Sequence, residues 1–251
     1  MIAWNDLQQI AVSQKVSPFV ILREYIQILF LNNFYSLANT ENTVFKGGTC
    51  IRLIHGSNRF SEDLDFTTNL ENTKLNSLVR NTVDLLVKST PPISIKTIHT
   101  ISGFTQKLSI ITGHSVTPLS IKLDFSQREN VLQKNRGLIS STLPISSFSP
   151  IVYMEKEEIL AEKCRALTTR HKGRDIYDLW YLLMRKTPIN LELIQKKFDY
   201  YGQRFEKDEL IESINAWKFE DFDQDVRGFL PESDRNVLLH VISSLVNWLK
   251  E

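Results

Sequence analysis

The sequence has few of the features that mark several classes of protein. Its two cysteines, Cys50 and Cys164, lie far apart and in no metal-ligand spacing, so neither a disulfide framework nor a cysteine-rich zinc site is expected. Nine glycines and eight prolines in 251 residues exclude collagen-like and low-complexity chains. Thirty basic residues against 29 acidic ones leave a formal charge of +1, which excludes a polybasic protein but not a local basic groove.

Long apolar segments are also missing. Apolar runs end well before the ~18 residues that a membrane span needs. Residues 1–6 show no basic region leading into an apolar stretch, as a signal peptide would. We therefore expect a cytoplasmic protein with no membrane partner. With 42% hydrophobic residues, the chain is long enough for one large domain or two small ones.

Hydrophobic periodicity predicts an α+β half followed by a helical half. Helices are expected over residues 6–35 (two helices, the second starting at Ser17-Pro18), 49–55 and 75–88, and strands over 43–45, 64–67, 93–100, 107–112 and 119–125. Residues 127–150 are expected to form a loop, with room for a short strand near Ile139. Further helices are expected over residues 155–170, 175–185, 191–198, 208–217 and 233–249. The predicted domains are an α+β lobe over residues 1–150 and a helical lobe over 151–251.

A Gly-Gly turn is the first candidate for chemistry. Gly47 and Gly48 connect a short strand to a short helix, and Thr49 follows them. Backbone N–H groups and a hydroxyl at such a position can hold phosphate. By itself, however, a Gly-Gly turn is more often a purely structural connection.

Two aspartates on the next strand favour a functional role for this Gly-Gly turn. Asp63 and Asp65 are two residues apart, so their side chains share one face while Leu64 and Phe66 point to the other. Two carboxylates ~4 Å apart repel by up to about 4 kcal/mol at an effective dielectric near 20, which a fold tolerates when a divalent cation lies between them. Oxygen ligands suit Mg²⁺ better than zinc. Asp124, on a strand that could lie beside the first, completes the pattern of a two-metal phosphoryl-transfer site.

These motifs together resemble known families. Gly-Gly-Thr, Asp-x-Asp and a later strand aspartate are similar to the polymerase-β-type minimal nucleotidyltransferases. The stretches RFSEDLD (residues 59–65), AEKCRAL (161–167) and RDIYDLW (174–180) resemble the AbiEii/AbiGii toxin family, whose members include the MenT toxins of mycobacteria. The resemblance covers roughly residues 40–185. It implies an α+β fold: a mixed sheet with flanking helices that carries the metal site, plus a C-terminal helical lobe that closes a cleft.

The resemblance also implies a function. Members of the family transfer a nucleoside monophosphate from an NTP with Mg²⁺, and those with known targets modify the 3′ end of tRNA and so block translation. They act as the toxin of a toxin–antitoxin or phage-defence pair. We therefore expect Mg²⁺ (two ions), an NTP substrate, a tRNA or other RNA 3′ end as acceptor, and a cognate antitoxin.

The resemblance assigns roles to particular residues. The nucleotide would be held by Gly47, Gly48, Thr49, Arg59, Ser61 and Lys163; the metal by Asp63, Asp65 and Asp124; and the catalytic set would be Asp63, Asp65, Asp124, Lys163 and Asp175. Asp124 would polarise the attacking hydroxyl, and Lys163 would contact the phosphates. Asp178 is the alternative to Asp175 as the late functional aspartate.

The later residues also have structural interpretations. A lone lysine such as Lys163 is usually a solvated residue on a helix face. Asp175 and Asp178 could form a capping and ion-pair cluster that pins their helix to the one bearing Lys163. Arg59 could clamp phosphates through two hydrogen bonds or simply pair with Glu62.

Weaker signals complete the analysis. Lys122 could face the same side as Asp124 or balance its charge. The five histidines show no ligand spacing and are expected to be structural or on the surface. Basic residues between positions 163 and 174, with Lys134 and Arg136, could bind an RNA backbone.

Two other functions stay open on sequence grounds. One is transfer to a protein or small-molecule hydroxyl. The other is a catalytically inactive module that binds nucleotide or RNA, although the presence of all three acids counts against it.

Overall fold

The computed structural model describes residues 2–98 and 103–250. Contacts divide the chain into two compact units: residues 1–56 with 60–154, and residues 57–59 with 155–251. Residues 57–59 thus belong to the second unit although both neighbouring segments belong to the first. The first unit also continues past residue 150, because residues 151–154 form a strand of its sheet.

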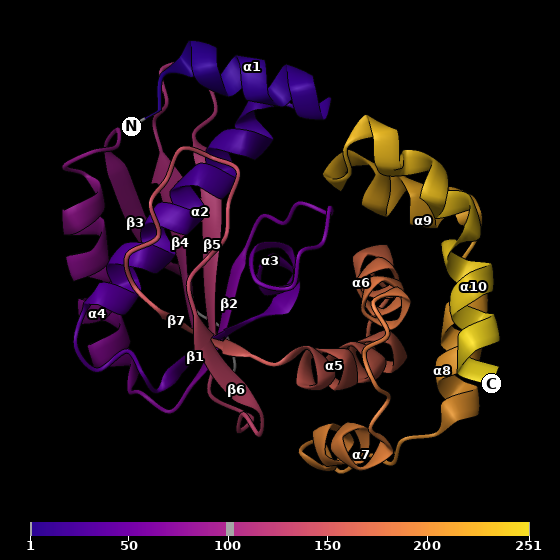
Figure 1. Ribbon diagram of the computed structural model, residues 1–251. Helices are drawn as coiled ribbons and strands as arrows, with labels where there is room; N and C mark the ends of the chain where they lie inside the picture. The colour runs from indigo at the N-terminus through magenta and orange to yellow at the C-terminus, as the bar shows by residue number, and fades with distance from the viewer. Residues whose placement is uncertain (1, 99–102, 251) are drawn as a thin grey trace. The chain divides into compact units, whose positions relative to one another are not determined.

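The first unit consists of helices and one mixed sheet (Figure 1). Its helices are α1 (Trp4–Gln14), α2 (Pro18–Ser36), α3 (Gly47–Leu53) and α4 (Asn72–Leu86). Its strands are β1 (Thr43–Lys46), β2 (Leu64–Thr68), β3 (Ile93–Ile98), β4 (Phe104–Ile110), β5 (Leu119–Ser126), β6 (Lys134–Gly137) and β7 (Ile151–Met154). The α+β class predicted from the sequence is confirmed.

The start of α2 follows from its capping residues. The hydroxyl of Ser17 accepts a hydrogen bond from the backbone N–H of Phe19 at 3.3 Å, and Pro18 occupies the first turn, where its missing N–H costs nothing. Apolar side chains surround most of this helix, and Phe30 and Phe34 are fully buried. The two helices predicted over residues 6–35 are therefore confirmed.

The seven strands lie in the order β3-β4-β5-β2-β1-β7-β6. β4 and β5 form an antiparallel hairpin, and β5 runs parallel to β2. This parallel pairing confirms the expectation that the strand of Asp124 lies beside that of Asp65.

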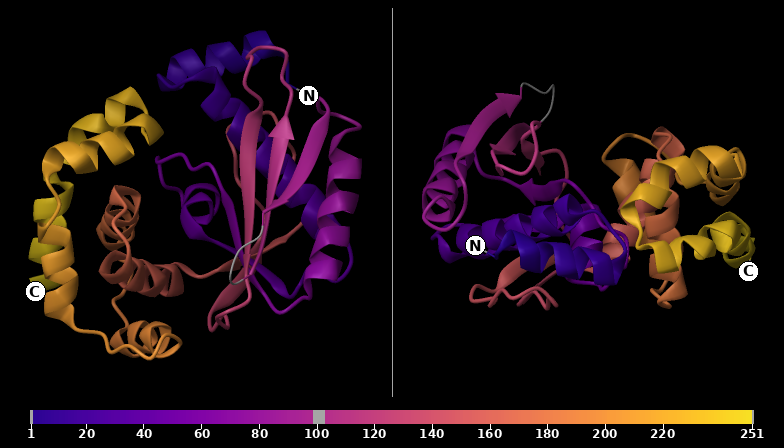
Figure 2. Two further views of the ribbon diagram at one scale, coloured as in Figure 1. Left: turned by 180° about the vertical axis from the view of Figure 1, so that it is seen from behind. Right: turned by 90° about the horizontal axis from the view of Figure 1, so that it is seen from above.

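One face of the sheet is covered by α2. The ring of Phe34 lies 5.7 Å from that of Phe66 and 6.3 Å from that of Phe125. Figure 2 shows the same arrangement from behind, with β4 and β5 in front of α2. Because side chains alternate along a strand, Asp65 and Asp124 point to the opposite face.

The second unit is helical within the described part of the chain. It contains α5 (Lys156–Thr169), α6 (Gly173–Met184), α7 (Leu191–Asp199), α8 (Lys207–Asn215), α9 (Phe219–Val226) and α10 (Leu238–Lys250), with 3₁₀ turns at Arg227–Phe229 and Glu232–Val237. Cys50 and Cys164 are both buried thiols and form no disulfide with each other, and burial raises the pKa of the Cys164 thiol to about 12. No helix in the described residues is both long and apolar enough to cross a bilayer.

Several predicted elements need correction. The segment 127–150 is not entirely loop: it contains β6 at Lys134–Gly137 rather than a strand near Ile139. β7 and α9 were not expected, and the helix predicted from residue 233 begins as a 3₁₀ turn and becomes α-helical at Leu238. The strand predicted to residue 100 ends in the described residues at Ile98, and positions 99 and 100 lie outside them.

Candidate active site

The three aspartates of the first unit meet on one face of the sheet. Asp65 of β2 and Asp124 of β5 are direct partners in the parallel register. Asp63 comes just before β2, two residues from Asp65, and all three side chains are partly exposed. The face opposite α2 therefore carries a group of carboxylates that solvent can reach.

The Gly-Gly turn lies directly against this group. Gly47 has φ +78°, in the left-handed region that favours glycine, and a Cβ at this position would overlap the carboxylate of Asp65. Lys46, the residue before it, is the register partner of Asp65 across β1 and β2. The turn thus needs glycine for its backbone angle and for its close approach to Asp65.

Thr49 ties the turn to the segment that carries the acids. Its hydroxyl donates a hydrogen bond to the backbone carbonyl of Asp63, and the side chain is buried. The carbonyl of Ser61 accepts a hydrogen bond from the side chain of Gln27 at 3.2 Å. The hydrogen bond to Asp63 gives Thr49 a positioning role beside the acids, in addition to the nucleotide contact that the resemblance implies.

Lys122 lies among the three acids. Its Nζ is 2.7 Å from Oδ2 of Asp124, whose Oδ1 accepts a hydrogen bond from the hydroxyl of Thr105 at 3.1 Å. Burial acts to lower the pKa of Lys122, but its bond to Asp124 and the negative charges of all three aspartates outweigh burial and raise that pKa. Lys122 faces the same side as Asp124 and balances part of the carboxylate charge.

The donors available to a metal ion are oxygens. In residues 2–98 and 103–250, no three His, Cys, Asp or Glu side chains are grouped closely enough to form a complete metal site. Mg²⁺ usually binds one or two carboxylates and takes its other ligands from phosphates and water. Asp63 and Asp65 fit that pattern, whereas Asp124 would first have to exchange the bond to Lys122.

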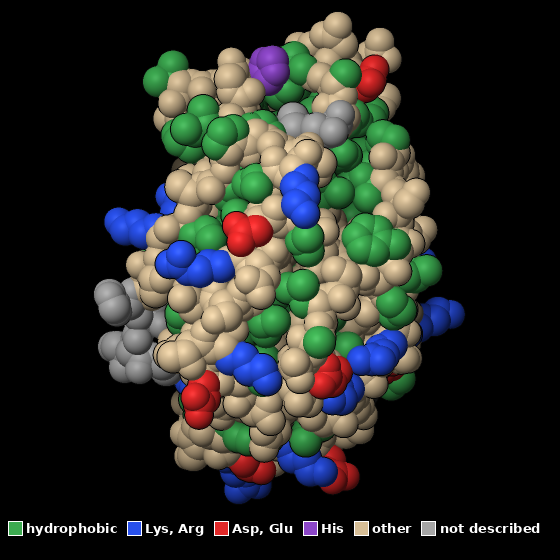
Figure 3. All heavy atoms as spheres, turned by 90° about the vertical axis from the view of Figure 1, so that its left-hand side faces the viewer, with side chains coloured by type: hydrophobic (Ala, Val, Ile, Leu, Met, Phe, Trp, Pro, Cys, Tyr) green, Lys and Arg blue, Asp and Glu red, His purple; other side chains and the backbone are tan. Residues whose placement is uncertain are grey.

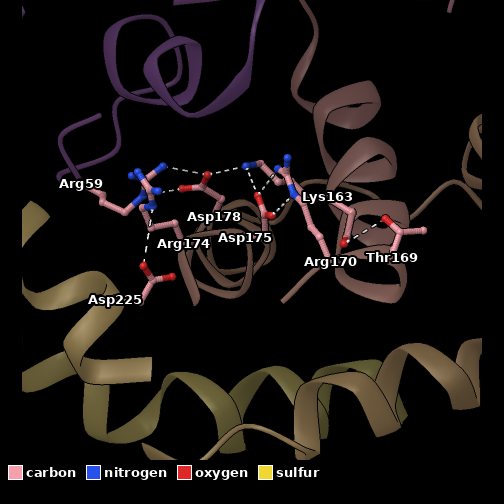
Figure 4. A network of polar contacts seen from close by, with 9 residues as sticks. Arg59, Lys163, Thr169, Arg170, Arg174, Asp175, Asp178 and Asp225 are labelled. Carbon is pink, nitrogen blue, oxygen red and sulfur yellow. Dashed lines mark hydrogen bonds and ion pairs between the residues drawn. The ribbon is translucent and has the colours of Figure 1, made fainter. Parts of the chain in front are cut away.

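A second charged cluster occupies the interior of the second unit (Figure 4). Arg59 donates two hydrogen bonds to Asp178, both 2.8 Å long. Lys163 bridges Asp178 and Asp175, with 2.7 Å to each, and Arg170 donates to Asp175 at 2.8 and 3.0 Å. Only Arg170 is exposed; the other four side chains are buried.

Each buried group of this cluster is held in its charged form. Burial alone would raise the pKa values of Asp175 and Asp178, but the neighbouring cations lower both. Likewise, burial acts to lower the pKa values of Arg59 and Lys163, and the two aspartates raise them. Two buried cations, Arg59 and Lys163, and the exposed Arg170 therefore stabilise two buried carboxylates.

The structure sorts the sequence-predicted residues into two groups. Gly47, Gly48, Thr49, Ser61, Asp63, Asp65 and Asp124 belong to the first unit, and Arg59, Lys163, Asp175 and Asp178 to the second. The solvated interpretation of Lys163 is wrong, because this side chain is buried and carries two ion pairs. Arg59 pairs with Asp178, and Glu62 pairs with Arg23 at 3.0 Å.

The basic residues that the sequence predicts to bind RNA are also divided between the two units. His171 stacks on Trp217 with 3.6 Å between ring centroids, and Arg174 lies 4.0 Å from Asp225. Lys134 and Arg136 are exposed on β6 in the other unit. In the face shown in Figure 3, basic and acidic side chains are interspersed, in keeping with the small net charge.

Comparison with known proteins identifies the family. A family model described as the nucleotidyl transferase AbiEii toxin of type IV toxin–antitoxin systems matches residues 29–242. The chain belongs to the AbiEii family. It is therefore a nucleotidyltransferase of a toxin family, as the motifs in the sequence imply.

Solved structures share the fold of this AbiEii protein. MenT4, a nucleotidyltransferase toxin from Mycobacterium tuberculosis H37Rv, is 16% identical with a TM-score of 0.68, covering 100% of this chain and 90% of MenT4. JHP933 from Helicobacter pylori is 22% identical with a TM-score of 0.58, covering 94% of this chain and 95% of its own. No curated protein sequence matches.

Proposed function

We propose that this protein transfers a nucleoside monophosphate from an NTP to the 3′-hydroxyl of an RNA, with the acceptor end of tRNA as the substrate. The observation that carries the proposal is the register of Asp65 beside Asp124, with Gly47 packed against Asp65. A phosphate-holding turn in contact with paired carboxylates is what transfer of a nucleotidyl group requires.

The residues of the first unit have separate roles in the proposal. Asp63 and Asp65 would hold Mg²⁺, which would supply positive charge beside the triphosphate. Gly47 and Gly48 leave backbone room for the phosphates beside Asp65. The 3′-oxygen forms a bond to the α-phosphorus, the bond from that phosphorus to the bridging oxygen breaks, and pyrophosphate leaves. Asp124 polarises the hydroxyl and takes its proton.

The buried cluster of the second unit bears on the role that the resemblance gives to Lys163. A phosphate contact by Lys163 requires its ammonium to exchange one of two carboxylates, each at 2.7 Å, for a phosphate oxygen. Asp175 then keeps Lys163 in position as the late aspartate of the motif. Because Asp178 already binds the guanidinium of Arg59 twice, we give Arg59 and Asp178 positioning roles.

The biological role follows from family membership. A type IV toxin–antitoxin family implies an NTP substrate and a cognate antitoxin. Modification of tRNA 3′ ends would block translation, as part of growth control or phage defence. That target would also place the protein in the cytoplasm.

The experiment is transfer of label from each α-³²P-labelled NTP to total tRNA with Mg²⁺, beside Asp63→Ala. The expected result is label on the 3′ end of tRNA that the variant does not produce. Label on a protein or a small molecule instead would mean that this molecule, and not RNA, is the acceptor. A fully active Asp63→Ala variant would overturn the metal assignment.

A further inference from the structure

A polar cavity lies at the end of β2 in the first unit. It has a volume of about 270 Å³, and its lining includes Val44, Thr67 and the segment that follows β5, at residues 127 and 129–131. Sites for drug-sized ligands span about 300–1,000 Å³. A single ring system with its substituents is therefore a suitable occupant.

This cavity opens on the face of the sheet that bears the acids. Thr67 is two residues beyond Asp65, so both side chains point to the same side. In the register of β1 and β2, Val44 is the partner of Thr67, as Lys46 is of Asp65. Two residues along a strand span about 7 Å, so the cavity begins about that far from Asp65 of the proposed reaction centre.

Thr67 has the marks of a ligand contact. Its side chain is 4% exposed, and among the described residues its hydroxyl has no hydrogen-bond partner. On the other face, Thr43 and Thr68 satisfy each other at 3.2 Å. Leaving a buried hydroxyl unbonded costs free energy, which a ligand in the cavity would recover.

The remaining polar lining indicates the class of ligand. Glu129 is buried at 7% exposure, and a threonine, four amide side chains and a lysine complete the polar lining: Thr68, Asn42, Asn69, Gln127, Asn130 and Lys134. A buried carboxylate disfavours a phosphate, whereas amides offer both donors and acceptors. Carboxylates accept hydrogen bonds from the exocyclic amino groups of bases.

We propose that this cavity binds a nucleobase bearing an exocyclic amino group, and so selects the nucleotide used in the reaction. The inference rests on the proposed nucleotidyl transfer. Glu129 accepts from the amino group, and the hydroxyl of Thr67 bonds to the ring edge. Uracil, which presents an oxygen in place of that amino group, is disfavoured. The base belongs either to the NTP or to the last nucleotide of the acceptor.

A binding assay tests the cavity without any transfer. The full chain is titrated with AMP, CMP, GMP and UMP by ligand-observed NMR, for the native protein, Thr67→Val and Glu129→Gln. Thr82→Val serves as the matched control, because Thr82 is equally buried but bonds to the Leu78 carbonyl within α4. Melting temperatures verify that each variant is folded.

The expected result is a preference of about tenfold or more for at least one amino-bearing nucleotide over UMP. Glu129→Gln should bring that ratio close to one, Thr67→Val should reduce it, and Thr82→Val should keep it. Equal binding of all four nucleotides by the native protein, or an unchanged ratio in folded Glu129→Gln, would overturn the proposal.

Transfer assays then identify the source of the base and separate the two proposals. Four labelled NTPs are combined with RNAs ending in each of the four nucleotides. A Glu129→Gln shift in NTP preference assigns the cavity to the donor, and a shift in terminal-nucleotide preference assigns it to the acceptor. Selective binding of nucleotides without transfer to any RNA would support the proposed base-binding cavity and contradict the proposal that RNA is the acceptor. If the native protein and Glu129→Gln both transfer nucleotide with the same preference for NTP and terminal nucleotide, the cavity does not select the base, and the proposed function is unaffected.

Discussion

The aspartates of the two units lie in opposite environments. In the first unit, Asp63, Asp65 and Asp124 lie on one partly exposed sheet face with Lys122 among them. In the second, Asp175 and Asp178 are buried and bonded to several cations. The first group lies where solvent, and therefore a cation or a phosphate-bound metal, can reach it. The second group is already neutralised and fixes α5, α6 and residues 57–59 to one another.

For Asp65 and Asp178, this difference separates function from stability. Removing a carboxylate from a group of like charges relieves repulsion, so the fold should tolerate it. Removing a carboxylate from a buried ion pair leaves a cation without its partner, which is strongly destabilising. Four variations of sequence or conditions can break or sharpen the contrast.

The largest expected effect on stability comes from Asp178→Ala. It leaves buried Arg59 without its two hydrogen bonds, and we expect the free energy of unfolding to fall by about 3–5 kcal/mol. Urea denaturation measures the loss. Asp223→Ala is the control, since it removes an ion pair to the half-exposed Arg227 and should cost less than about 1 kcal/mol. Equal losses in the two variants would remove the distinction between buried and surface pairs.

Acid should act on the same cluster. Because the folded-state pKa values of Asp175 and Asp178 are lowered, their contribution to stability is present above their ordinary pKa of about 3.9 and is lost as the pH falls through the folded values. We expect the urea midpoint to fall steeply below about pH 4. Asp178→Asn should flatten this dependence, and parallel curves for the two proteins would show that the cluster does not cause it.

Gly47→Ala tests the contact between the turn and Asp65. The variant forces alanine into a positive φ at a cost of about 1–3 kcal/mol, and its Cβ displaces the carboxylate, so transfer should be lost. Gly113→Ala is a matched control with φ +74° and open space around the added Cβ. Denaturation and transfer assays of both separate backbone strain from overlap. Full transfer activity in Gly47→Ala would mean that Asp65 does not need its observed position.

The smallest effect is expected for Lys122→Met. Removing a cation from among three carboxylates should lower the Mg²⁺ concentration for half-maximal transfer by a few fold, on the scale of about 1 kcal/mol for a partly exposed pair. Lys74→Met changes an exposed lysine on α4 and should leave the Mg²⁺ midpoint unchanged. A higher midpoint in Lys122→Met would mean that Lys122 assists metal binding instead of opposing it.

Sequence reasoning worked where alternation or capping fixes the structure. The alternation of Asp65 with Phe66 and of Asp124 with Phe125 predicts both the strands and the shared acidic face, and Ser17-Pro18 predicts the start of α2. β6 escaped prediction because its residues, KNRG, include no apolar side chain, and β7 because its residues, IVYM, show no alternation of polar and apolar side chains. α9 carries Phe219, Phe222 and Val226 at helical spacing, a pattern that the sequence reasoning missed.

The buried cluster and the cavity depended on tertiary structure. The sequence shows Arg59 and Asp178 as parts of two motifs, but their pairing joins residues that are distant in the chain. Glu129 lies in a stretch without periodicity, and only the passage of that stretch near Thr67 reveals a lining. Burial, which the sequence does not show, places Lys163 at the centre of an ion-pair cluster and excludes the alternative of a solvated residue on a helix face.

The most direct measurement compares Asp65→Asn with Asp178→Asn in the same two assays, melting temperature and nucleotidyl transfer. Asp65→Asn should retain or raise the melting temperature while transfer falls by about a hundredfold or more, as when a catalytic group is removed. Asp178→Asn should lower the melting temperature by several degrees at least. A destabilised Asp65→Asn that still transfers nucleotide, beside a stable Asp178→Asn, would contradict the division of labour between the two groups of aspartates.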